Sequence, residues 1–422
     1  MPRIVLNTSG SLGDLHPYLA VGAALRARGH DVVLASHPEY RERAEGAGLE
    51  FVPVGGNLTD FGALEDVMKL AMARRTGSRF VIEKLVLGPL RRCIDDLLAG
   101  AAGADLLVSH VVSPAGPVVA EKLGIPRVHA VLQPFAMYSA TDPPVLPVLP
   151  FAHWWQRRGP ATWRALYALM RAASSPWLRV VEAERARLGL PPGRGHALFD
   201  MWSPRLNLAL FSTAIAAPQP DWPAHTVAAG FPMWRGSGHD ELPPELERFL
   251  AAGEPPVVFT LGSSAVYDAR EFYTESARAA ASLGVRAVLL TGPDDRNPVP
   301  AALLSDRIAR FEYAPFDRLL PRAAATVHQG GIGTTAQALA AGRPMLVMPY
   351  SHDQPDNAHR CVRAGVARTI DRDHYTARTA ARELAALLTD EQAKQSARTI
   401  GNQLAAEHGA ERAAEAIERT LA

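Results

Sequence analysis

Residues 3–14 read Arg-Ile-Val-Leu-Asn-Thr-Ser-Gly-Ser-Leu-Gly-Asp, an apolar run that leads into a glycine-rich turn. The run predicts a buried parallel strand from Arg3 to Ser9. From Pro17 to Arg28 apolar residues recur at helical spacing, and Gly29 ends that helix. Asp31 to Ser36 predicts a second strand. Strand, helix and strand in about thirty residues form a βαβ unit, which implies a right-handed crossover and a parallel sheet.

The same alternation continues along the chain, breaks off between residues 133 and 234, and restarts after Pro255. Two such blocks predict an α/β protein with two Rossmann-like, doubly wound domains that face each other across a crevice. Such folds bind ligands at the carboxyl ends of their strands. Further strands are expected at 105–110, 127–132, 257–261, 286–291, 308–312, 324–328 and 345–349, and further helices at 117–123, 271–283, 334–341, 357–364 and in much of 376–421.

The domain boundaries follow from a proline-rich stretch, residues 217–244, that separates the two blocks. Prolines interrupt regular elements, so this stretch is typical of a connector. We expect an N-terminal domain at 1–215, a linker at 216–245, a second domain at 246–405, and a C-terminal helix at 406–422 that could pack back on the N-terminal domain.

The composition excludes several classes of protein. Among 422 residues, 44 lysines and arginines stand against 43 aspartates and glutamates, so the basic excess typical of nucleic-acid binding is missing. Only Cys93 and Cys361 are present, too few for a disulfide framework or a zinc ribbon. We find no signal-peptide pattern, and no apolar run of the ~18–20 residues that a membrane-spanning helix needs. These features predict a cytoplasmic protein without a transmembrane segment.

The motif with the most chemical content is His328-Gln-Gly-Gly-Ile-Gly-Thr-Thr, placed between a predicted strand and a predicted helix. Glycines let the backbone approach a ligand closely, and the N–H groups at a helix start form an anion site. His328 can donate to a phosphate oxygen, and Thr334 can add a hydroxyl. The motif therefore predicts phosphate binding by His328, Gly330, Gly331, Gly333 and Thr334.

An alternative interpretation of the same segment stays open. Gly331, Gly333 and Ala336 also satisfy the dinucleotide fingerprint G-x-G-x-x-G/A, and Asp353 follows about twenty residues later. That fingerprint normally lies in the first turn after a domain's first strand, whereas several predicted strands precede it here. An NAD(P)-dependent oxidoreductase is therefore the less favoured alternative.

The tryptophans cluster in the stretch where the strand–helix pattern breaks off. They could fill core space between helices, or they could form the aromatic wall that an apolar ligand needs. We expect a hydrophobic ligand on this side of the protein. The cluster comprises Trp154, Trp155, Trp163, Trp177, Trp202, Trp222 and Trp234.

Taken together, the motifs resemble those of the family 1 glycosyltransferases of the GT-B fold, which include sterol, flavonoid and antibiotic glycosyltransferases. Within the bacterial branch, the rhamnolipid rhamnosyltransferase type is similar. The resemblance covers essentially the whole chain. It is carried by Gly10-Ser-Leu-Gly-Asp-Leu-His-Pro17, Pro218-Gln-Pro-Asp-Trp-Pro223, Tyr313-Ala-Pro315, the His328 motif, Ala341-Gly-Arg-Pro344, Pro349, His352-Asp-Gln354 and Asn357-Ala358.

The resemblance implies an acceptor-binding N-terminal domain and a C-terminal domain that holds a nucleotide-diphosphate sugar. By this resemblance Tyr313 stacks on a uracil or thymine base, and His328, Gly333 and Thr334 meet the diphosphate. Ser263 matches a phosphate-side serine, while Asp353 and Gln354 match the pair that faces the sugar hydroxyls. Relatives carry a ribose-binding glutamate where this chain has Ala336, so the ribose contact is not implied.

The resemblance also implies a catalytic base at Asp14, where the plant enzymes have a histidine. Those enzymes pair their histidine with an aspartate after a later strand, and the matching position here is His110. We therefore expect an Asp14–His110 pair with the residue types exchanged, and His16 is a second candidate base. A single base on the acceptor side implies direct displacement and inversion at the anomeric carbon.

The expected reaction moves a hexose from a UDP-glucose or dTDP-rhamnose type of donor to a hydroxyl of a hydrophobic or phenolic small molecule, such as a flavonoid, polyketide or lipid. A lipid acceptor would allow peripheral contact with a membrane. No metal and no further cofactor is expected, because His352-Asp353 and Asp294-Asp295 are the only compact candidate ligands and neither forms a cluster. A noncatalytic nucleotide-sugar-binding partner of another transferase is the remaining alternative.

Overall fold

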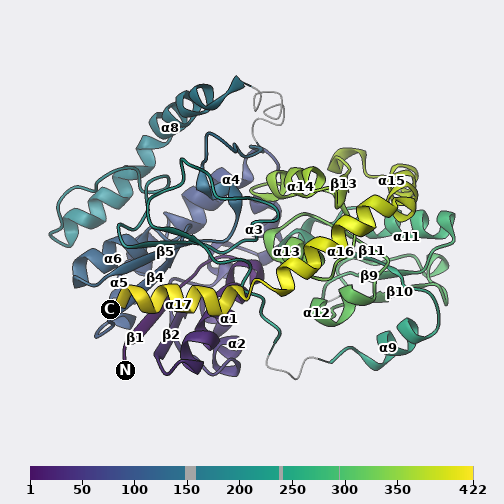
Figure 1. The fold of residues 1–422 in the computed structure, drawn as a ribbon, viewed down its shortest axis with the longest axis horizontal. Coiled ribbons are helices and arrows are strands. Elements are labelled where there is room, and N and C mark those ends of the chain that lie inside the picture. The colour runs from purple at the N-terminus through teal and green to yellow at the C-terminus, as the bar shows by residue number, and fades with distance from the viewer. Residues whose placement is uncertain (148–157, 237–240, 294, 422) are drawn as a thin grey trace. The chain divides into compact units, whose positions relative to one another are not determined.

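The computed structural model describes residues 1–147, 158–236, 241–293 and 295–421 (Figure 1). The chain divides into two compact units. Unit 1 comprises residues 1–67, 76–234 and 407–422, and unit 2 comprises residues 68–75 and 235–406. Each unit is built on one parallel sheet with helices, so the prediction of two Rossmann-like domains is confirmed.

The sheet of unit 1 has seven strands in the order β3-β2-β1-β4-β5-β6-β7, and every neighbouring pair is parallel. The step from β1 to β4 is where the strand order reverses, the position at which such sheets bind ligands. The strands are β1 Arg3–Asn7, β2 Asp31–Ser36, β3 Glu50–Pro53, β4 Leu106–His110, β5 Arg127–Val131, β6 Leu206–Ala209 and β7 Thr226–Ala228.

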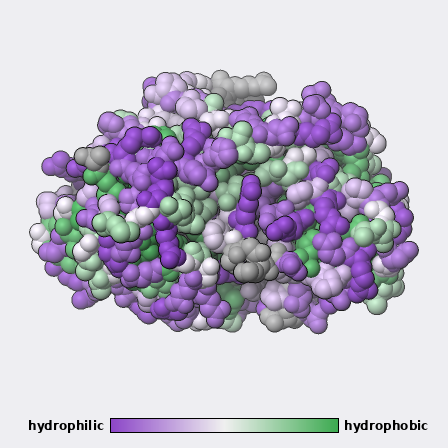
Figure 2. Space-filling view, turned by 60° about the horizontal axis from the view of Figure 1, so that its bottom comes forward, coloured by the Kyte–Doolittle hydropathy of each residue, from purple (hydrophilic) through white to green (hydrophobic). Residues whose placement is uncertain are grey.

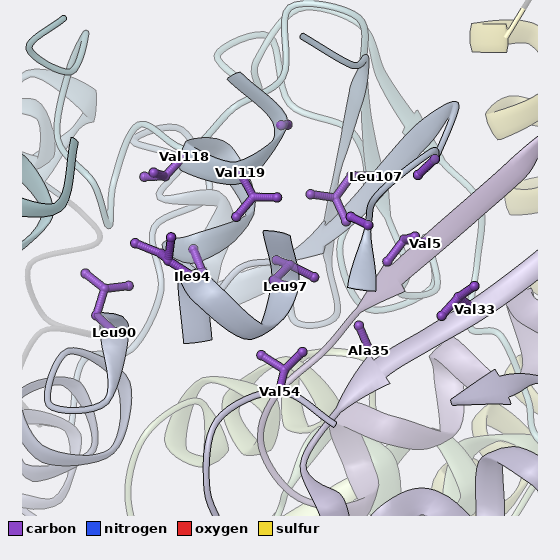
Figure 3. Close-up of a cluster of buried hydrophobic side chains, with 14 of the residues drawn as sticks. Val5, Val33, Ala35, Val54, Leu90, Ile94, Leu97, Leu107, Val118 and Val119 are labelled. Atoms are coloured by element: carbon purple, nitrogen blue, oxygen red, sulfur yellow. The ribbon is translucent and has the colours of Figure 1, made fainter. Parts of the chain in front are cut away.

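Apolar side chains join this sheet to its helices. Val5, Val33 and Leu107 project from neighbouring strands towards Ile94 and Val119 of two helices, and all five are fully buried (Figure 3). Burial of this kind on a strand face explains the uninterrupted apolar runs in the sequence. The helices of this unit are α1 Leu12–Ala27, α2 Arg41–Gly46, α4 Gly77–Phe80, α5 Leu90–Gly100, α6 Ala115–Leu123, α8 Pro160–Arg187 and α17 Gly409–Leu421, while α3 Leu64–Ala71 contributes residues to both units.

The sheet of unit 2 has six parallel strands in the order β10-β9-β8-β11-β12-β13. The strands are β8 Val257–Thr260, β9 Ala287–Leu290, β10 Ile308–Phe311, β11 Ala325–His328, β12 Met345–Val347 and β13 Ala367–Thr369. The helices are α9 Pro244–Ala251, α10 Gly262–Ala265, α11 Phe272–Leu283, α12 Phe316–Leu319, α13 Ile332–Ala340, α14 Gln354–Arg363, α15 Ala377–Thr389 and α16 Glu391–Ala405.

Three details differ from the sequence-based expectation. Helix α1 begins at Leu12 rather than Pro17, because Ser11 caps it and Pro17 is tolerated as its sixth residue. The expected linker 216–245 contains β7, which pairs with β6, and unit 1 runs on to Trp234. The stretch after residue 133, where the strand–helix alternation was expected to break off and no helix was assigned, includes the 28-residue helix α8. Local patterns missed these elements because packing on neighbours stabilises them.

The expected aromatic wall is also corrected. Trp163 is 1% exposed and packs on Tyr167, whereas Trp177 lies against the core cluster drawn in Figure 3. Trp202 packs on His129 and Trp222 on Phe211. Core filling is therefore the correct interpretation for Trp163. Trp177, Trp202 and Trp222 are half-buried and pack at separate places, and Trp234 is also half-buried. Trp154 and Trp155 lie outside the described residues.

Hydrophilic side chains cover most of the face in Figure 2, and the hydrophobic residues visible there form small, scattered patches. Across the described ranges, no helix has the length and apolar character needed to cross a bilayer.

The C-terminal helix α17 packs on α1 within unit 1. Its Glu418 accepts hydrogen bonds from Arg28 at 2.5 Å and faces the His30 ring nitrogen at 2.8 Å. Just before the helix, Glu407 accepts a 2.5 Å hydrogen bond from the Ser212 hydroxyl. The Arg28 and His30 bonds lower the pKa of Glu418 to about 2.

We predict that Glu418→Gln lowers the urea midpoint at pH 7 and increases hydrogen exchange in residues 409–421. A carboxyl with a lowered pKa stabilises the fold fully above its unfolded pKa near 4.5, and this contribution is lost as the pH falls towards 2. The difference between wild type and variant should therefore narrow from pH 5 to pH 3. Glu415→Gln is the matched control, since Glu415 lies 4.0 Å from Arg28. If the difference in urea midpoint between wild type and variant widens in acid, Glu418 does not stabilise the fold through a lowered pKa.

Candidate active site

In unit 1, the first turn of α1 holds Asp14 at the carboxyl end of β1. Asp14 Oδ2 accepts hydrogen bonds from the Ser11 backbone N–H at 2.8 Å and the Ser11 hydroxyl at 3.1 Å, which closes a capping box. Gly10 has φ +126°, and a Cβ atom there would lie 2.4 Å from Asp14 Oδ2. The glycine is therefore required so that the carboxylate can fold back over the turn.

His110 ends β4, the strand beside β1, and is buried. Its Nε2 lies 3.7 Å from Asp14 Oδ1, and its Nδ1 lies 3.0 Å from the Ser9 carbonyl oxygen. Because a carbonyl only accepts, Nδ1 carries the proton of the neutral ring. Burial lowers the pKa of His110, although Asp14 and the Ser9 carbonyl oppose that effect. The structure thus brings the predicted pair together, with an unprotonated Nε2 facing the carboxylate.

The exposure of the two groups differs. The Asp14 side chain is 22% exposed, while the His110 side chain is fully buried behind it. Tyr18 packs edge-on against the His110 ring at 5.8 Å between centroids, which holds the ring in place. A molecule arriving from solvent would therefore meet Asp14 first. His16, the second candidate base, lies on the same helix and is partly buried.

In unit 2, His328 ends β11 and is completely buried. Its Nδ1 accepts a hydrogen bond of 3.0 Å from the Gly330 N–H, so the proton of the neutral ring is on Nε2. Burial lowers the pKa of His328 to about 3, which keeps the ring neutral at physiological pH. Within the described part of the chain, Nε2 has no hydrogen-bond partner. A buried donor without a partner is costly unless a ligand accepts from it.

The turn after His328 leads into α13, whose first residue follows Gly331. No side chain caps the N-terminus of this helix, so its N–H groups are available to an anion. Gly330 has φ +86°, and a Cβ there would lie 2.8 Å from a Val347 methyl group. Gly333 and the buried Thr334 belong to the first turn of the same helix.

Other predicted donor-site residues lie around this turn. A Cβ at Gly262 would come within 2.5 Å of the Gln329 amide, which places the turn of the exposed Ser263 against the His328 turn. The buried Gln354 accepts a 2.9 Å bond from the Tyr350 N–H through Oε1. Tyr313 follows β10 and is 57% exposed, as a side chain that stacks on a ligand would be.

Asn357 is part of the family motif, but no role could be assigned to it from the sequence. Its amide nitrogen donates to the Gly330 carbonyl at 2.9 Å and to Asp353 Oδ2 at 2.6 Å. One buried side chain thus fixes the glycine turn and the Asp353 carboxylate relative to each other. The sequence feature that could have indicated this role is the position of Asn357 one helical turn after Asp353.

The described residues contain no cluster of metal-binding side chains. No three His, Cys, Asp or Glu side chains in those ranges come close enough to hold an ion. Burial lowers the pKa of His352, the neighbour of Asp353, to about 4. Asp294 lies outside the described residues.

Comparison with known proteins assigns the family. Residues 4–140 match the N-terminal domain of glycosyltransferase family 28, and residues 281–419 match the C-terminal domain of erythromycin biosynthesis protein CIII-like proteins. The chain is 33% identical to O-mycaminosyltylonolide 6-deoxyallosyltransferase of Streptomyces fradiae, over 99% of this chain and 97% of that protein. It is 28% identical to a sterol 3-beta-glucosyltransferase of Debaryomyces hansenii, over 98% of this chain but only 26% of that longer protein.

A solved structure supports the same fold. The glycosyltransferase VinC, crystallised in complex with DTDP, superposes with a TM-score of 0.69 and 21% identity over 99% of both chains. The two parallel-sheet units agree with the GT-B fold, and the family models and the relative from Streptomyces fradiae assign the family. The chain belongs to the GT-B glycosyltransferases and is an enzyme of that family.

We predict that Asn357→Ala lowers the free energy of unfolding by roughly 1–3 kcal/mol, the usual cost of leaving buried hydrogen-bonding groups unpaired. It should also weaken the binding of UDP or dTDP, because the Gly330 turn and Asp353 lose their shared link. Urea denaturation and calorimetric titration measure the two effects. Asn402→Ala, at an exposed position, is the control. Unchanged nucleotide affinity in Asn357→Ala would show that this link does not shape the site.

Proposed function

We propose that the enzyme is an inverting transferase that moves a hexose from a nucleotide-diphosphate sugar to a hydroxyl of a hydrophobic or phenolic small molecule. The observation that carries this proposal is the buried, neutral His328, whose Nε2–H has no acceptor among the described residues and lies beside an uncapped helix N-terminus. Such a donor suits a diphosphate leaving group, whose negative charge grows as the sugar departs.

The donor side rests on residues of unit 2. In this proposal His328, Gly330, Gly331, Gly333, Thr334 and Ser263 hold the diphosphate, Tyr313 stacks on the base, and Asp353 with Gln354 faces the sugar. An aromatic face accepts uracil and thymine alike. The DTDP in the VinC structure favours a thymidine donor, and a thermal-shift comparison of UDP with dTDP tests the choice.

The acceptor side rests on residues of unit 1. A cavity of about 30 Å³ beside Ser9 is lined by polar residues such as Thr8 and His37 and by Val54 and Leu90; it adjoins the turn that carries Asp14 but is too small to hold an acceptor by itself. The names of the two relatives give a tylonolide glycoside and a sterol as their acceptors. We propose an acceptor of comparable apolar character. Glycosylation of soluble sugars or proteins alone in an acceptor panel would contradict it.

The proposed step begins at the acceptor hydroxyl. Its oxygen attacks the anomeric carbon, the bond from that carbon to the diphosphate oxygen breaks, and the hydroxyl proton passes to Asp14. His110 Nε2, unprotonated and 3.7 Å away, can stabilise or receive that proton. Attack from the face opposite the leaving group inverts the anomeric configuration.

A cytoplasmic location is part of the proposal. Cys93 and Cys361 are both free thiols, as expected in a reducing compartment. A lipid acceptor would bring the enzyme to a membrane surface without a spanning segment. The alternatives are a noncatalytic nucleotide-sugar-binding partner and an NAD(P)-dependent oxidoreductase. Consumption of the nucleotide sugar in the presence of a mixed panel of phenols and sterols would exclude the noncatalytic partner. Oxidation of NAD(P)H would instead indicate the oxidoreductase.

Asp14→Asn should lower turnover by about 10² or more and leave UDP or dTDP affinity unchanged, because the amide cannot take the acceptor proton. His110→Ala should cause a smaller loss, larger for aliphatic alcohols than for phenols, since phenols ionise more readily. Steady-state kinetics and calorimetry provide both readouts. If Asp14→Asn retains turnover while His16→Ala does not, the base is His16.

His328→Ala should reduce turnover by roughly 10²–10³, the cost of removing one donor from a developing anion, and should weaken nucleotide binding. Because the pKa of His328 is about 3, the wild-type affinity should show no titration of this ring between pH 5 and pH 9. His374→Ala, at an exposed position of the same unit, is the control. Unchanged kinetics in His328→Ala would remove it from the diphosphate site.

EDTA should leave activity unchanged, because neutral N–H donors rather than a cation are proposed to hold the leaving group. The assay compares initial rates after exhaustive chelation with rates after magnesium is restored. Activity that disappears in EDTA and returns with magnesium would contradict a metal-independent mechanism.

A further inference from the structure

Unit 2 contains a second cavity, far along the sheet from the residues assigned to the donor. It has a volume of about 370 Å³, within the range of small-molecule sites. Pro255, Ala324 and Pro344 line it, and each lies just before a strand: β8, β11 and β12. The cavity is therefore at the amino-terminal edge of the sheet, whereas His328 ends β11 at the opposite edge.

Three cationic side chains converge on this cavity: Arg343, Lys394 and Arg398. Arg343 comes from the loop before β12, while Lys394 and Arg398 lie one turn apart on one face of α16. Close packing brings these elements together, since a Cβ on Gly401 would lie 2.9 Å from the Gly342 Cα. The two glycines thus allow α16 to approach the loop that carries Arg343.

The two arginines have only neutral hydrogen-bond partners among the described residues. Arg343 donates through Nε and Nη2 to the Pro321 carbonyl, and Arg398 donates through the same two nitrogens to the Gln395 amide oxygen. Both Nη1 groups remain available. Burial lowers the pKa of Arg343, and the charge of Arg398 lowers it further. Glu391 interacts with both Lys394 and Arg398 and balances their charges only in part, so the repulsion between the two arginines favours an anion.

The acidic groups near the cavity are already engaged. Lys394 pairs with Glu391 at 2.7 Å. Glu254, on the rim, is 83% exposed and lies 3.6 Å from Arg307. Glu391 is thus shared by Lys394 and Arg398, Glu254 faces Arg307, and the three cations of the cavity keep an excess of positive charge. Leu388 and Pro344 add an apolar wall beside them.

We propose that this cavity binds a phosphate monoester with an apolar substituent, held by the Nη1 groups of Arg343 and Arg398. A phosphate dianion balances two guanidinium charges, whereas a carboxylate balances one, and arginine binds phosphate oxygens in a forked geometry. The apolar wall accommodates the substituent. Because this site lies at the other edge of the sheet, its ligand should bind together with the donor nucleotide.

Calorimetric titration of the full chain with hexyl phosphate tests the proposal, with UDP or dTDP kept saturating so that the donor site is occupied. One molecule should bind per chain. Arg398→Gln, at an exposed position, should weaken binding by about tenfold, and Arg343→Gln/Arg398→Gln should weaken it further. Arg378→Gln removes an equal charge from exposed α15 and should leave the affinity unchanged.

Further probes identify the chemistry of the ligand. Inorganic phosphate and hexanoate should each bind about tenfold or more weakly than hexyl phosphate, because one lacks the apolar part and the other carries a single charge. If the protein co-sediments with phosphatidic acid vesicles and Arg398→Gln abolishes this, the ligand is a lipid headgroup. If hexyl phosphate binds but the vesicles do not, the ligand is a soluble ester, and both results support the site. Hexyl phosphate binding that persists in the double variant, or tighter binding of a polyglutamate peptide, would overturn it.

Discussion

Parallel strands that are covered on both faces leave room for polar chemistry only at their ends, and this constraint organises the whole protein. In β4 and β11 every residue is buried, and each strand ends in a histidine. Burial lowers the pKa of His110 and of His328, so both rings are neutral. A neutral imidazole has one donor and one acceptor nitrogen, and the backbone around it decides which is which.

The two histidines are fixed in opposite tautomers. His110 Nδ1 donates to the Ser9 carbonyl, which leaves Nε2 as an acceptor beside the Asp14 carboxylate. His328 Nδ1 accepts from the Gly330 N–H, which leaves Nε2–H as a donor beside a helix start without a cap. The first arrangement suits the removal of a proton, and the second suits the stabilisation of an anion. One residue type at equivalent strand ends thus supports two different parts of the proposed transfer.

Residues that carry no charge set much of this geometry. Gly10 permits the Asp14 carboxylate to fold over its turn, and Gly330 permits the turn after His328 to pass close to Val347. Asn357 then links that turn to Asp353 through two hydrogen bonds from one amide. Similarly, Gly342 and Gly401 allow the close packing that gathers two arginines at the far edge of the same sheet. At the four glycine positions the absence of a side chain is what lets functional groups come together.

The sequence predicted two parallel-sheet units because buried parallel strands are continuous apolar runs, and it indicated the glycosyltransferase family through the resemblance of several motifs. It also singled out Asp14 and His110, although only by resemblance. It misplaced the start of α1 at Pro17 and missed β7 in the expected linker, since capping by Ser11 and pairing with β6 are contacts rather than local patterns. It suggested an aromatic wall, whereas Trp163 is buried in the core and Trp177, Trp202 and Trp222 pack at separate places. Only the tertiary structure decided the tautomers of His110 and His328, the link through Asn357 and the pairing of Arg343 with Arg398. Each of these features depends on contacts between groups that folding brings together, and a sequence pattern does not show such contacts.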